Sequence, residues 1–170
     1  MNSICDDEYA RQQALESLLV LDTPEEQAYD DITRLAADVC GTPIALICLT
    51  DNHRQWFKSR MGLQVREMPR ENSFCSYVLD TTHSMLIVAD ASADERFVNH
   101  PLVMGDPNIR FYAGAPLFTR GGHMLGALCV VDTIPRELDA SQMEELQFMA
   151  QQVLVMLENR AASGQLIPQA

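Results

Sequence analysis

The sequence has 170 residues, of which 47% are hydrophobic, so it is long enough for one domain with a core of its own and too short for two. Its 24 acidic and 12 basic residues leave a formal charge of −12, which disfavours binding to nucleic acid or to an anionic membrane surface. No apolar run approaches the roughly 18 residues that span a bilayer, and the acidic N-terminus is unlike a secretory signal, so a cytoplasmic location is predicted.

Two helices are predicted before the first strand. Apolar residues recur at helical spacing over residues 6–21, which predicts an amphipathic helix. Asp22 or Thr23 then offers a side-chain cap and Pro24 suits a first helical position, so a second helix is predicted over residues 24–40. Gly41 is expected to end it.

Residues 44–132 are predicted to form a mainly antiparallel sheet of five or six strands. The apolar run at 44–49 indicates a strand that is covered on both faces, and a short turn leads into a second strand at 55–61, which carries Trp56 as an expected core residue. Further strands are predicted at 85–89, 111–118 and 125–131, with a loop at 63–72, a short helix at 74–79 and a long excursion at 90–106.

A last helix is predicted over residues 139–160, where Asp139 and Gln142 resemble a capping box. Its apolar stripe is broad, and the first helix is also striped. The helices are therefore expected either to pack on the sheet or to form a dimer bundle, and residues 163–170 are expected to be a tail or the start of a linker. The start at Met1 and the helix near the C-terminus favour an N-terminal domain cut from a longer protein.

Residue types that often act in catalysis or bind metals form no recognisable catalytic or metal-binding pattern in this sequence. The sequence has five cysteines but no C-x-x-C pair, and its four histidines lie in predicted turns or loops without a Ser or Cys partner at a readable spacing. No metal site and no catalytic residue is predicted, and no cofactor is identified. One region is rich in positive charge, which we interpret as a solvated face or, alternatively, as a site for a small anion; it comprises Arg54, Lys58, Arg60, Arg66 and Arg70.

Several blocks of sequence resemble GAF domains of the type found at the N-terminus of bacterial sensor histidine kinases and diguanylate cyclases. They are residues 14–18 (ALESL), 21–26 (LDTPEE), 51–59 (DNHRQWFKS), 73–75 (SFC), 88–91 (VADA), 110–117 (RFYAGAPL) and 125–132 (LGALCVVD). Together they run through nearly the whole chain in the expected order. The resemblance implies one GAF domain over residues 1–162.

The resemblance implies an α+β, GAF-like (PAS-related) fold with terminal helices on one face of an antiparallel sheet. Short helices and loops would then enclose a pocket on the other face. It also implies a sensor that binds a small molecule, forms a homodimer through its terminal helices and acts on an output domain, either attached or in trans. The sequence carries neither the signature of the cyclic-nucleotide binders nor the chromophore-attachment cysteine of phytochromes.

Eight residues are predicted to line or border this pocket: Phe57, Ser73, Phe74, Cys75, Asp90, Phe97, Arg110 and Tyr112. Most have a purely structural alternative. The favoured interpretation of Cys75 is a small packed side chain and that of Asp90 is an Asx-turn, while Phe97 is expected to belong, with Leu102 and Met104, to a lid or to a pinned loop.

Three functions remain open on the sequence. The first is a non-catalytic sensor. The second is a thiol-dependent reductase similar to the GAF-fold reductases of free methionine sulfoxide, which depend on several pocket cysteines, whereas here only Cys75 is suitably placed. The third is a dimerisation module without a ligand.

Overall fold

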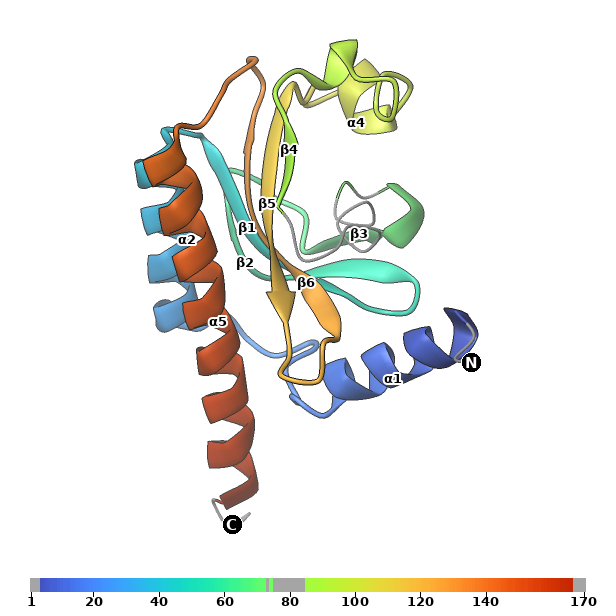
Figure 1. Ribbon diagram of the computed structural model, residues 1–170, viewed down its shortest axis with the longest axis vertical. Helices are drawn as coiled ribbons and strands as arrows, with labels where there is room; N and C mark the ends of the chain where they lie inside the picture. The colour runs from blue at the N-terminus through green and yellow to red at the C-terminus, as the bar shows by residue number, and fades with distance from the viewer. Residues whose placement is uncertain (1–3, 73, 75–84, 167–170) are drawn as a thin grey trace.

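The computed structural model describes residues 4–72, 74 and 85–166, and within them the side chains of residues 8–71, 74 and 85–163. A six-stranded sheet in the order β3-β2-β1-β6-β5-β4 forms the centre, and each neighbouring pair is antiparallel (Figure 1). The predicted α+β class is confirmed. The strands are β1 (Ile44–Thr50), β2 (Arg54–Met61), β3 (Glu67–Pro69), β4 (Leu86–Val88), β5 (Phe111–Phe118) and β6 (Met124–Asp132).

The sheet has a separate hydrophobic core on each face because successive strand residues point to opposite sides. In β1, Ile47 and Leu49 belong to the core beneath the helices, whereas Leu46 and Cys48 belong to the core on the other face. All seven residues of β1 are buried, as the uninterrupted apolar run predicted. Trp56 of β2 lies in the helix-side core, in agreement with its predicted role.

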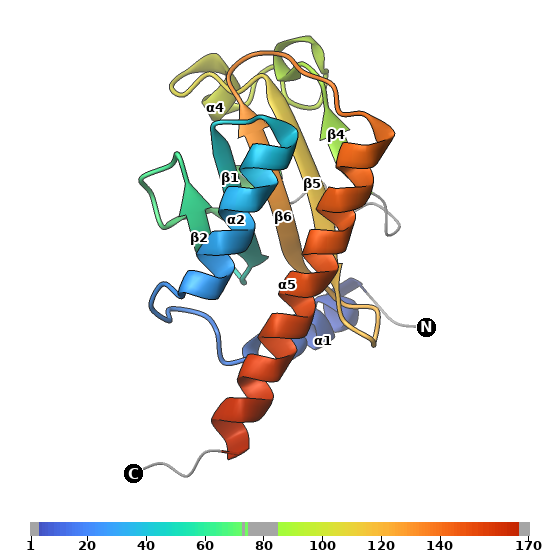
Figure 2. The same ribbon diagram turned by 90° about the vertical axis from the view of Figure 1, so that its left-hand side faces the viewer.

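Helices α2 (Gln27–Cys40) and α5 (Ala140–Leu166) lie side by side on one face of the sheet (Figure 2). The predicted capping box of α5 is present, since the backbone N–H of Gln142 donates to Asp139 at 2.8 Å and its side chain accepts from the Asp139 N–H at 2.9 Å. Gly41 ends α2 in the left-handed conformation, with φ of 68°. Helix α5 continues six residues past the predicted end at 160, into the segment expected to be a tail.

Helix α1 (Ile4–Glu16) differs from the prediction in its end and in its place. It stops five residues before residue 21, because the chain turns at Leu19, which has a positive φ of 55°. The turn brings Leu18 and Val20 into the helix-side core together with Leu15. The helix itself lies across one end of the sheet instead of alongside α5 (Figures 1 and 2).

Helix α2 begins three residues later than predicted. Thr23 and Pro24 do not cap it, and its N-cap residue Glu26 makes no side-chain capping bond. The segment instead surrounds the ammonium group of Lys58, which donates to Thr23 Oγ1 at 2.9 Å and to the Pro24 carbonyl at 2.7 Å. The buried ammonium group of Lys58 requires polar partners in this segment, and this requirement overrides the local sequence signal for a helix start.

The face of the sheet opposite α2 and α5 carries short elements joined by irregular chain. They are β3 and the 3₁₀ helix η1 (Arg70–Asn72), which replace part of the loop predicted over 63–72, then the 3₁₀ helix η2 (Ala91–Ala93) and α4 (Pro101–Met104). The short helix predicted at 74–79 lies outside the described residues, apart from Phe74. Within the described chain no helix has the length and apolarity to cross a membrane.

Candidate functional site

A cavity of about 400 Å³ lies between the sheet and the irregular segments on this face. Its floor comes from β1, β2, β5 and β6, and its walls come from the chain around β3 and from α4 with the residues that follow it. The volume falls within the roughly 300–1,000 Å³ that is common for small-molecule sites. Its described lining residues are Ile44, Leu46, Phe57, Leu63, Val65, Glu67, Met68, Pro69, Phe74, Pro101, Leu102, Asp106, Pro107, Ile109, Tyr112 and Val131.

An aromatic stack forms one side of the cavity. The ring of Phe74 lies between those of Phe97 and Tyr112, with centroid separations of 4.4 Å and 5.1 Å. The Tyr112 hydroxyl is 3.0 Å from Cys129 Sγ and is held within the wall. All three aromatic residues are buried. The stack therefore gives the cavity an apolar wall whose polar group is already partnered.

Hydrogen bonds hold residues 100–110, which cover the cavity and form its roof segment. The guanidinium of Arg110 donates to the carbonyl oxygens of Val103 and Ile109 at 3.0 and 2.9 Å. His100 Nδ1 accepts from the Leu102 N–H at 3.0 Å, and the Leu102 carbonyl accepts from the Ile109 N–H at 2.8 Å. The excursion predicted over 90–106 is thus folded back over the sheet with Leu102 and Ile109 in the cavity wall.

The family model that describes the GAF domain matches residues 24–157. The chain belongs to the GAF family. Over 143 residues the chain is 43% identical to a cyclic di-GMP phosphodiesterase of Pseudomonas aeruginosa, a match that covers 82% of this chain. The chain spans only 24% of the length of that relative.

Solved structures share the fold of this GAF domain. One is the GAF domain of the Acinetobacter phosphoenolpyruvate-protein phosphotransferase, with a TM-score of 0.66, 17% identity and coverage of 98% of this chain and 100% of that one. Another is the type II free methionine-R-sulfoxide reductase of Thermoplasma acidophilum, with a TM-score of 0.63, 10% identity and coverage of 90% and 95%. At these identities the likeness shows the fold alone.

Among the residues predicted for the pocket of this GAF domain, Phe57, Phe74 and Tyr112 are brought together in the cavity wall. Phe97 lies behind Phe74, and Arg110 holds the roof segment through backbone carbonyls. The eight residues stay predictions as ligand contacts.

Two other described residues that were predicted for the pocket region, Asp90 and Met104, do not line the cavity. Asp90 caps η2, where it accepts from the Ser92 N–H at 3.0 Å, which is the Asx-turn alternative. Ser73 and Cys75 lie outside the described residues. Met104, expected in a lid with Leu102, is 69% exposed and does not line the cavity.

Sequence reasoning missed most of the apolar lining. Ile44 and Leu46 belong to a strand that is buried on both faces, so their spacing could not reveal which of its residues border a cavity. Leu63, Val65 and Met68 lie in a segment interpreted as a plain loop. Three large apolar side chains within six residues were the available signal, since loops are mostly polar.

Each basic side chain in the region of concentrated positive charge has an acidic partner. Arg54 bonds to Asp22, Asp51 and Glu67 at 2.8 to 3.1 Å. The remaining pairs are Arg60 and Arg66 with Glu25, Lys58 with Glu26, and Arg70 with Glu8. The hydrogen bond from Arg54 lowers the pKa of Asp22.

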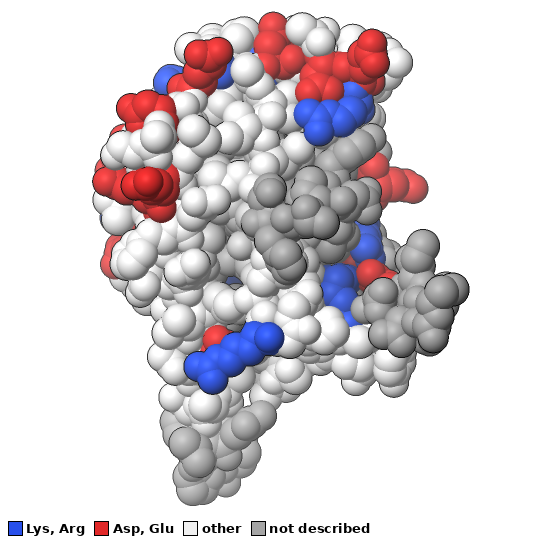
Figure 3. Space-filling model, in the orientation of Figure 1, with Lys and Arg blue, Asp and Glu red and all other residues white. Residues whose placement is uncertain are grey.

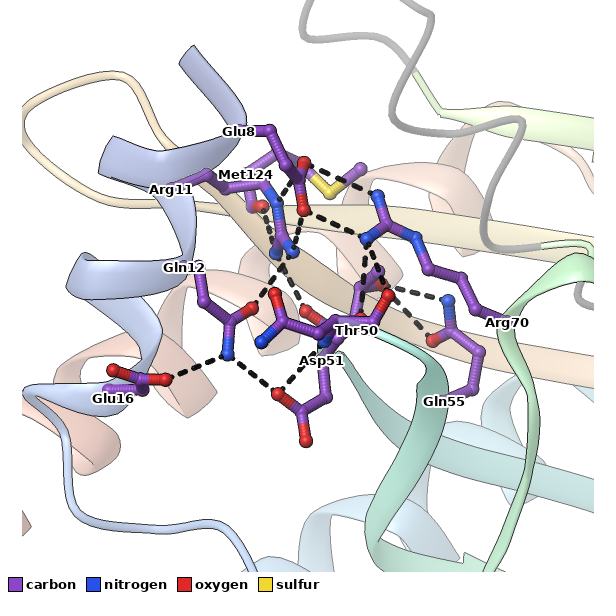
Figure 4. A network of polar contacts seen from close by, with 10 residues as sticks. Glu8, Arg11, Gln12, Glu16, Thr50, Asp51, Gln55, Arg70 and Met124 are labelled. Atoms are coloured by element: carbon purple, nitrogen blue, oxygen red, sulfur yellow. Dashed lines mark hydrogen bonds and ion pairs between the residues drawn. The ribbon is translucent and has the colours of Figure 1, made fainter. Parts of the chain in front are cut away.

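A polar network fastens α1 to the sheet (Figure 4). Arg11, almost fully buried, donates to the Thr50 carbonyl at 2.7 Å and to Glu8 at 2.8 Å. Glu8 also pairs with Arg70 at 2.8 Å, and Gln12 donates to Asp51 at 2.6 Å. The hydrogen bond from Arg11 lowers the pKa of Glu8 to about 2, against the opposing effect of burial, with a further contribution from Arg70.

A second ion-pair network links the sheet to α5. Glu26 accepts from Lys58 Nζ at 2.5 Å and from Arg160 Nε at 2.7 Å, and Arg160 also donates to the Leu19 carbonyl at 2.9 Å. Burial opposes the ionised form of Glu26, yet the hydrogen bonds from Lys58 and Arg160 outweigh it and lower its pKa. One carboxylate thus joins β2, the start of α2 and the second half of α5.

Proposed function

We propose that this GAF domain is a non-catalytic regulatory module that binds a small molecule in the cavity opposite α2 and α5. The observation that carries the proposal is the mostly apolar cavity beneath the roof segment, lined in part by Phe57, Phe74 and Tyr112. Pockets of this kind, with few polar groups, are typical of small-molecule sites. The domain comprises residues 1–162 in this proposal and acts in the bacterial cytoplasm.

The chemistry of the described side chains around the cavity supports a binding role more than a catalytic one. Cys48 and Cys129, the described cysteines of the cavity-side core, are completely buried, with Sγ atoms near Gln55 and Tyr112. A reactive thiol requires some exposure and electropositive surroundings. The reductase alternative rests on Cys75. Loss of a methionine sulfoxide reductase activity in Cys75→Ser would favour that alternative over ours.

A route from the cavity to the helices supports a sensory role. Phe57 lines the cavity, and the next residue, Lys58, extends to the opposite face of β2, where it holds Glu26. Glu26 holds Arg160 of α5. A ligand that displaces β2 would therefore act on the position of α5 through one carboxylate, provided that it binds the two arrangements with different affinity.

We also propose that α2 and α5 form the contact surface of a homodimer. Phe148 and Val155 lie seven residues apart on α5 and are 61% and 48% exposed, and Leu35 of α2 is 52% exposed. Large apolar side chains at this spacing mark one outer face of a helix. The relative in Pseudomonas aeruginosa is much longer than this chain, which supports an attached output domain that responds to the dimer.

Native mass spectrometry of the protein purified from its host tests the binding role. We expect a dimer that retains a small molecule, and a cavity-filling variant, Leu46→Trp, that remains folded and has lost it. A ligand retained by both proteins would lie elsewhere and contradict the assignment of the site. Protein that is consistently empty, and that takes up no compound from a host metabolite extract, would overturn the binding role.

A further inference from the structure

We infer that the cavity selects an apolar, ring-bearing molecule without negative charge, and so rejects nucleotides and other phosphate-bearing ligands. The inference rests on the proposed binding role and adds the chemical class of the ligand. Three observations carry it: the position of every basic side chain, the acidic groups at the rim, and the composition of the wall.

No lysine or arginine lines the cavity. The chain has 12 such residues, and all of them lie within the described part, because residues 73 and 75–84 contain none. The described lining residues include no basic side chain. Proteins that bind phosphate in a buried site usually supply Arg or Lys, since desolvating an anion without a partner is costly. The cavity lacks that compensation.

The basic side chains nearest in sequence to the lining residues have other partners. Arg110 donates to two backbone carbonyls of the roof segment. Arg66, between Val65 and Glu67, has a side chain that is 68% exposed and approaches Glu25 at 3.9 Å. Lys58, next to Phe57, pairs with Glu26. An anionic ligand would therefore have to break an existing ion pair or the roof to gain a cation.

The charged side chains among the described lining residues are acidic. Glu67 is half exposed and bonds to Arg54 at 3.1 Å, whereas Asp106 is exposed and has no ion pair within the described chain. Acidic side chains also dominate the surface around α4 and the start of α5 (Figure 3). With a net charge of −12, the field at the entrance repels anions and favours neutral or cationic molecules.

The composition of the cavity wall favours ligands that contain rings. Among the lining residues that the structure describes, every side chain apart from Glu67, Asp106 and Tyr112 is aliphatic, aromatic, methionine or proline. The aromatic residues Phe57, Phe74 and Tyr112 offer flat surfaces, and aromatic groups pack favourably against one another in offset or edge-to-face arrangements. The Tyr112 hydroxyl already bonds within the wall, so few directed hydrogen bonds are left for a polar ligand.

Two fluorescent probes that differ by one group test this inference. N-phenyl-1-naphthylamine is neutral, and 8-anilinonaphthalene-1-sulfonate carries the same rings with an added sulfonate. We expect saturable binding of the neutral probe with one site per chain. The sulfonate is expected to bind at least about tenfold more weakly, because its charge finds no cation in the cavity. Cyclic nucleotides should not displace the neutral probe.

Matched variants locate the binding. Leu102→Trp fills the cavity from its roof, whereas Leu154→Trp makes the same change at a half-buried leucine of α5 on the other face of the sheet. The first should abolish binding of the neutral probe and the second should leave it unchanged. Asp106→Lys should tighten sulfonate binding by about threefold or more, and Asp38→Lys on α2, with the same change in net charge, should not.

The outcomes separate this inference from the proposed function. If the sulfonate binds as tightly as the neutral probe, or a cyclic nucleotide displaces it, and Leu102→Trp blocks that binding, the ligand class is wrong while the cavity remains a binding site. If neither probe binds the parent protein, the ligand class is likewise wrong. If Leu102→Trp leaves both probes bound, the probes bind outside the cavity and the proposed function fails with the inference.

Discussion

Lys58 and Glu26 form an ion pair whose two ends differ sharply in exposure. The Lys58 side chain is completely buried, whereas that of Glu26 is 37% exposed, and Nζ lies 2.5 Å from Oε2. The ammonium of Lys58 also lies 5.2 Å from the centroid of the Tyr29 ring. The ion pair therefore forms mainly because the buried ammonium group of Lys58 requires a partner with the opposite charge.

The first prediction is an asymmetry between the two ends of this pair. Glu26→Gln should lower the free energy of unfolding by about 2 kcal/mol, because it leaves the ammonium buried without a carboxylate. Lys58→Met should cost about 1 kcal/mol or less, since the partly exposed Glu26 keeps its bond to Arg160. Urea denaturation near neutral pH measures both values.

Two further variants control for charge and for local packing at this pair. Glu25→Gln removes an exposed carboxylate that lies 3.3 Å from Arg60 and should change stability by less than about 0.5 kcal/mol. The double variant Glu26→Gln, Lys58→Met should be more stable than Glu26→Gln alone. Equal losses in the two single variants would contradict the dominance of the buried cation.

The second prediction concerns two buried tyrosines. The Tyr29 hydroxyl makes no hydrogen bond within the described chain, and burial raises its pKa to about 12. Tyr29→Phe should therefore leave stability unchanged or raise it by up to about 1 kcal/mol. Tyr112→Phe removes a hydroxyl that contacts Cys129 and should lower stability by up to about 1 kcal/mol. A loss in Tyr29→Phe that matches or exceeds the loss in Tyr112→Phe would show that Tyr29 has a partner.

Much of the fold follows from the sequence because the apolar periodicity of the strands and of α5 is strong. The hairpin of β1 and β2, the buried Trp56 and the cap at Asp139 were all predicted. The end of α1 and the start of α2 were not, because they depend on distant contacts. Helix α2 starts late since its first predicted turn binds Lys58, a residue more than 30 positions away.

Of the six predicted pocket residues that the structure describes, three line the cavity, and they are aromatic residues of the sheet and its flank: Phe57, Phe74 and Tyr112. The prediction was less accurate for the polar residues that were expected to line the pocket. Asp90 and Arg110 bond to nearby backbone, a use that local sequence does not distinguish from ligand contact. Ile44 and Leu46 were missed because a cavity and a filled core require the same apolar side chains.

The third prediction is a pH dependence of α1 that arises from Glu8. Its pKa is lowered from 4.5 to about 2 by Arg11 and Arg70, so the ionised form stabilises the folded state. This contribution is complete above the ordinary pKa and is lost as the pH falls towards 2. Glu8→Gln should therefore melt below the parent protein at about pH 7, and the difference should vanish near about pH 2.

Thermal denaturation followed by circular dichroism over this range measures the effect. Glu144→Gln, which removes an exposed carboxyl from α5, should shift the melting temperature little at any pH. A difference between Glu8→Gln and the parent that stays constant down to the lowest pH would mean that Glu8 acts through packing and not through its charge.

The fourth prediction concerns the outer surface of α2 and α5. Phe148→Asp places a charge where the proposed homodimer buries an aromatic side chain, so it should convert the dimer to a monomer and leave the folded domain intact. Tyr9→Asp makes a comparable change at a tyrosine of α1 that is 67% exposed and should leave the dimer unchanged. Sedimentation equilibrium across a concentration series gives the assembly state, and circular dichroism reports the fold. Dimers of equal affinity in both variants would exclude Phe148 from the contact, whereas monomers in both would place the contact at α1.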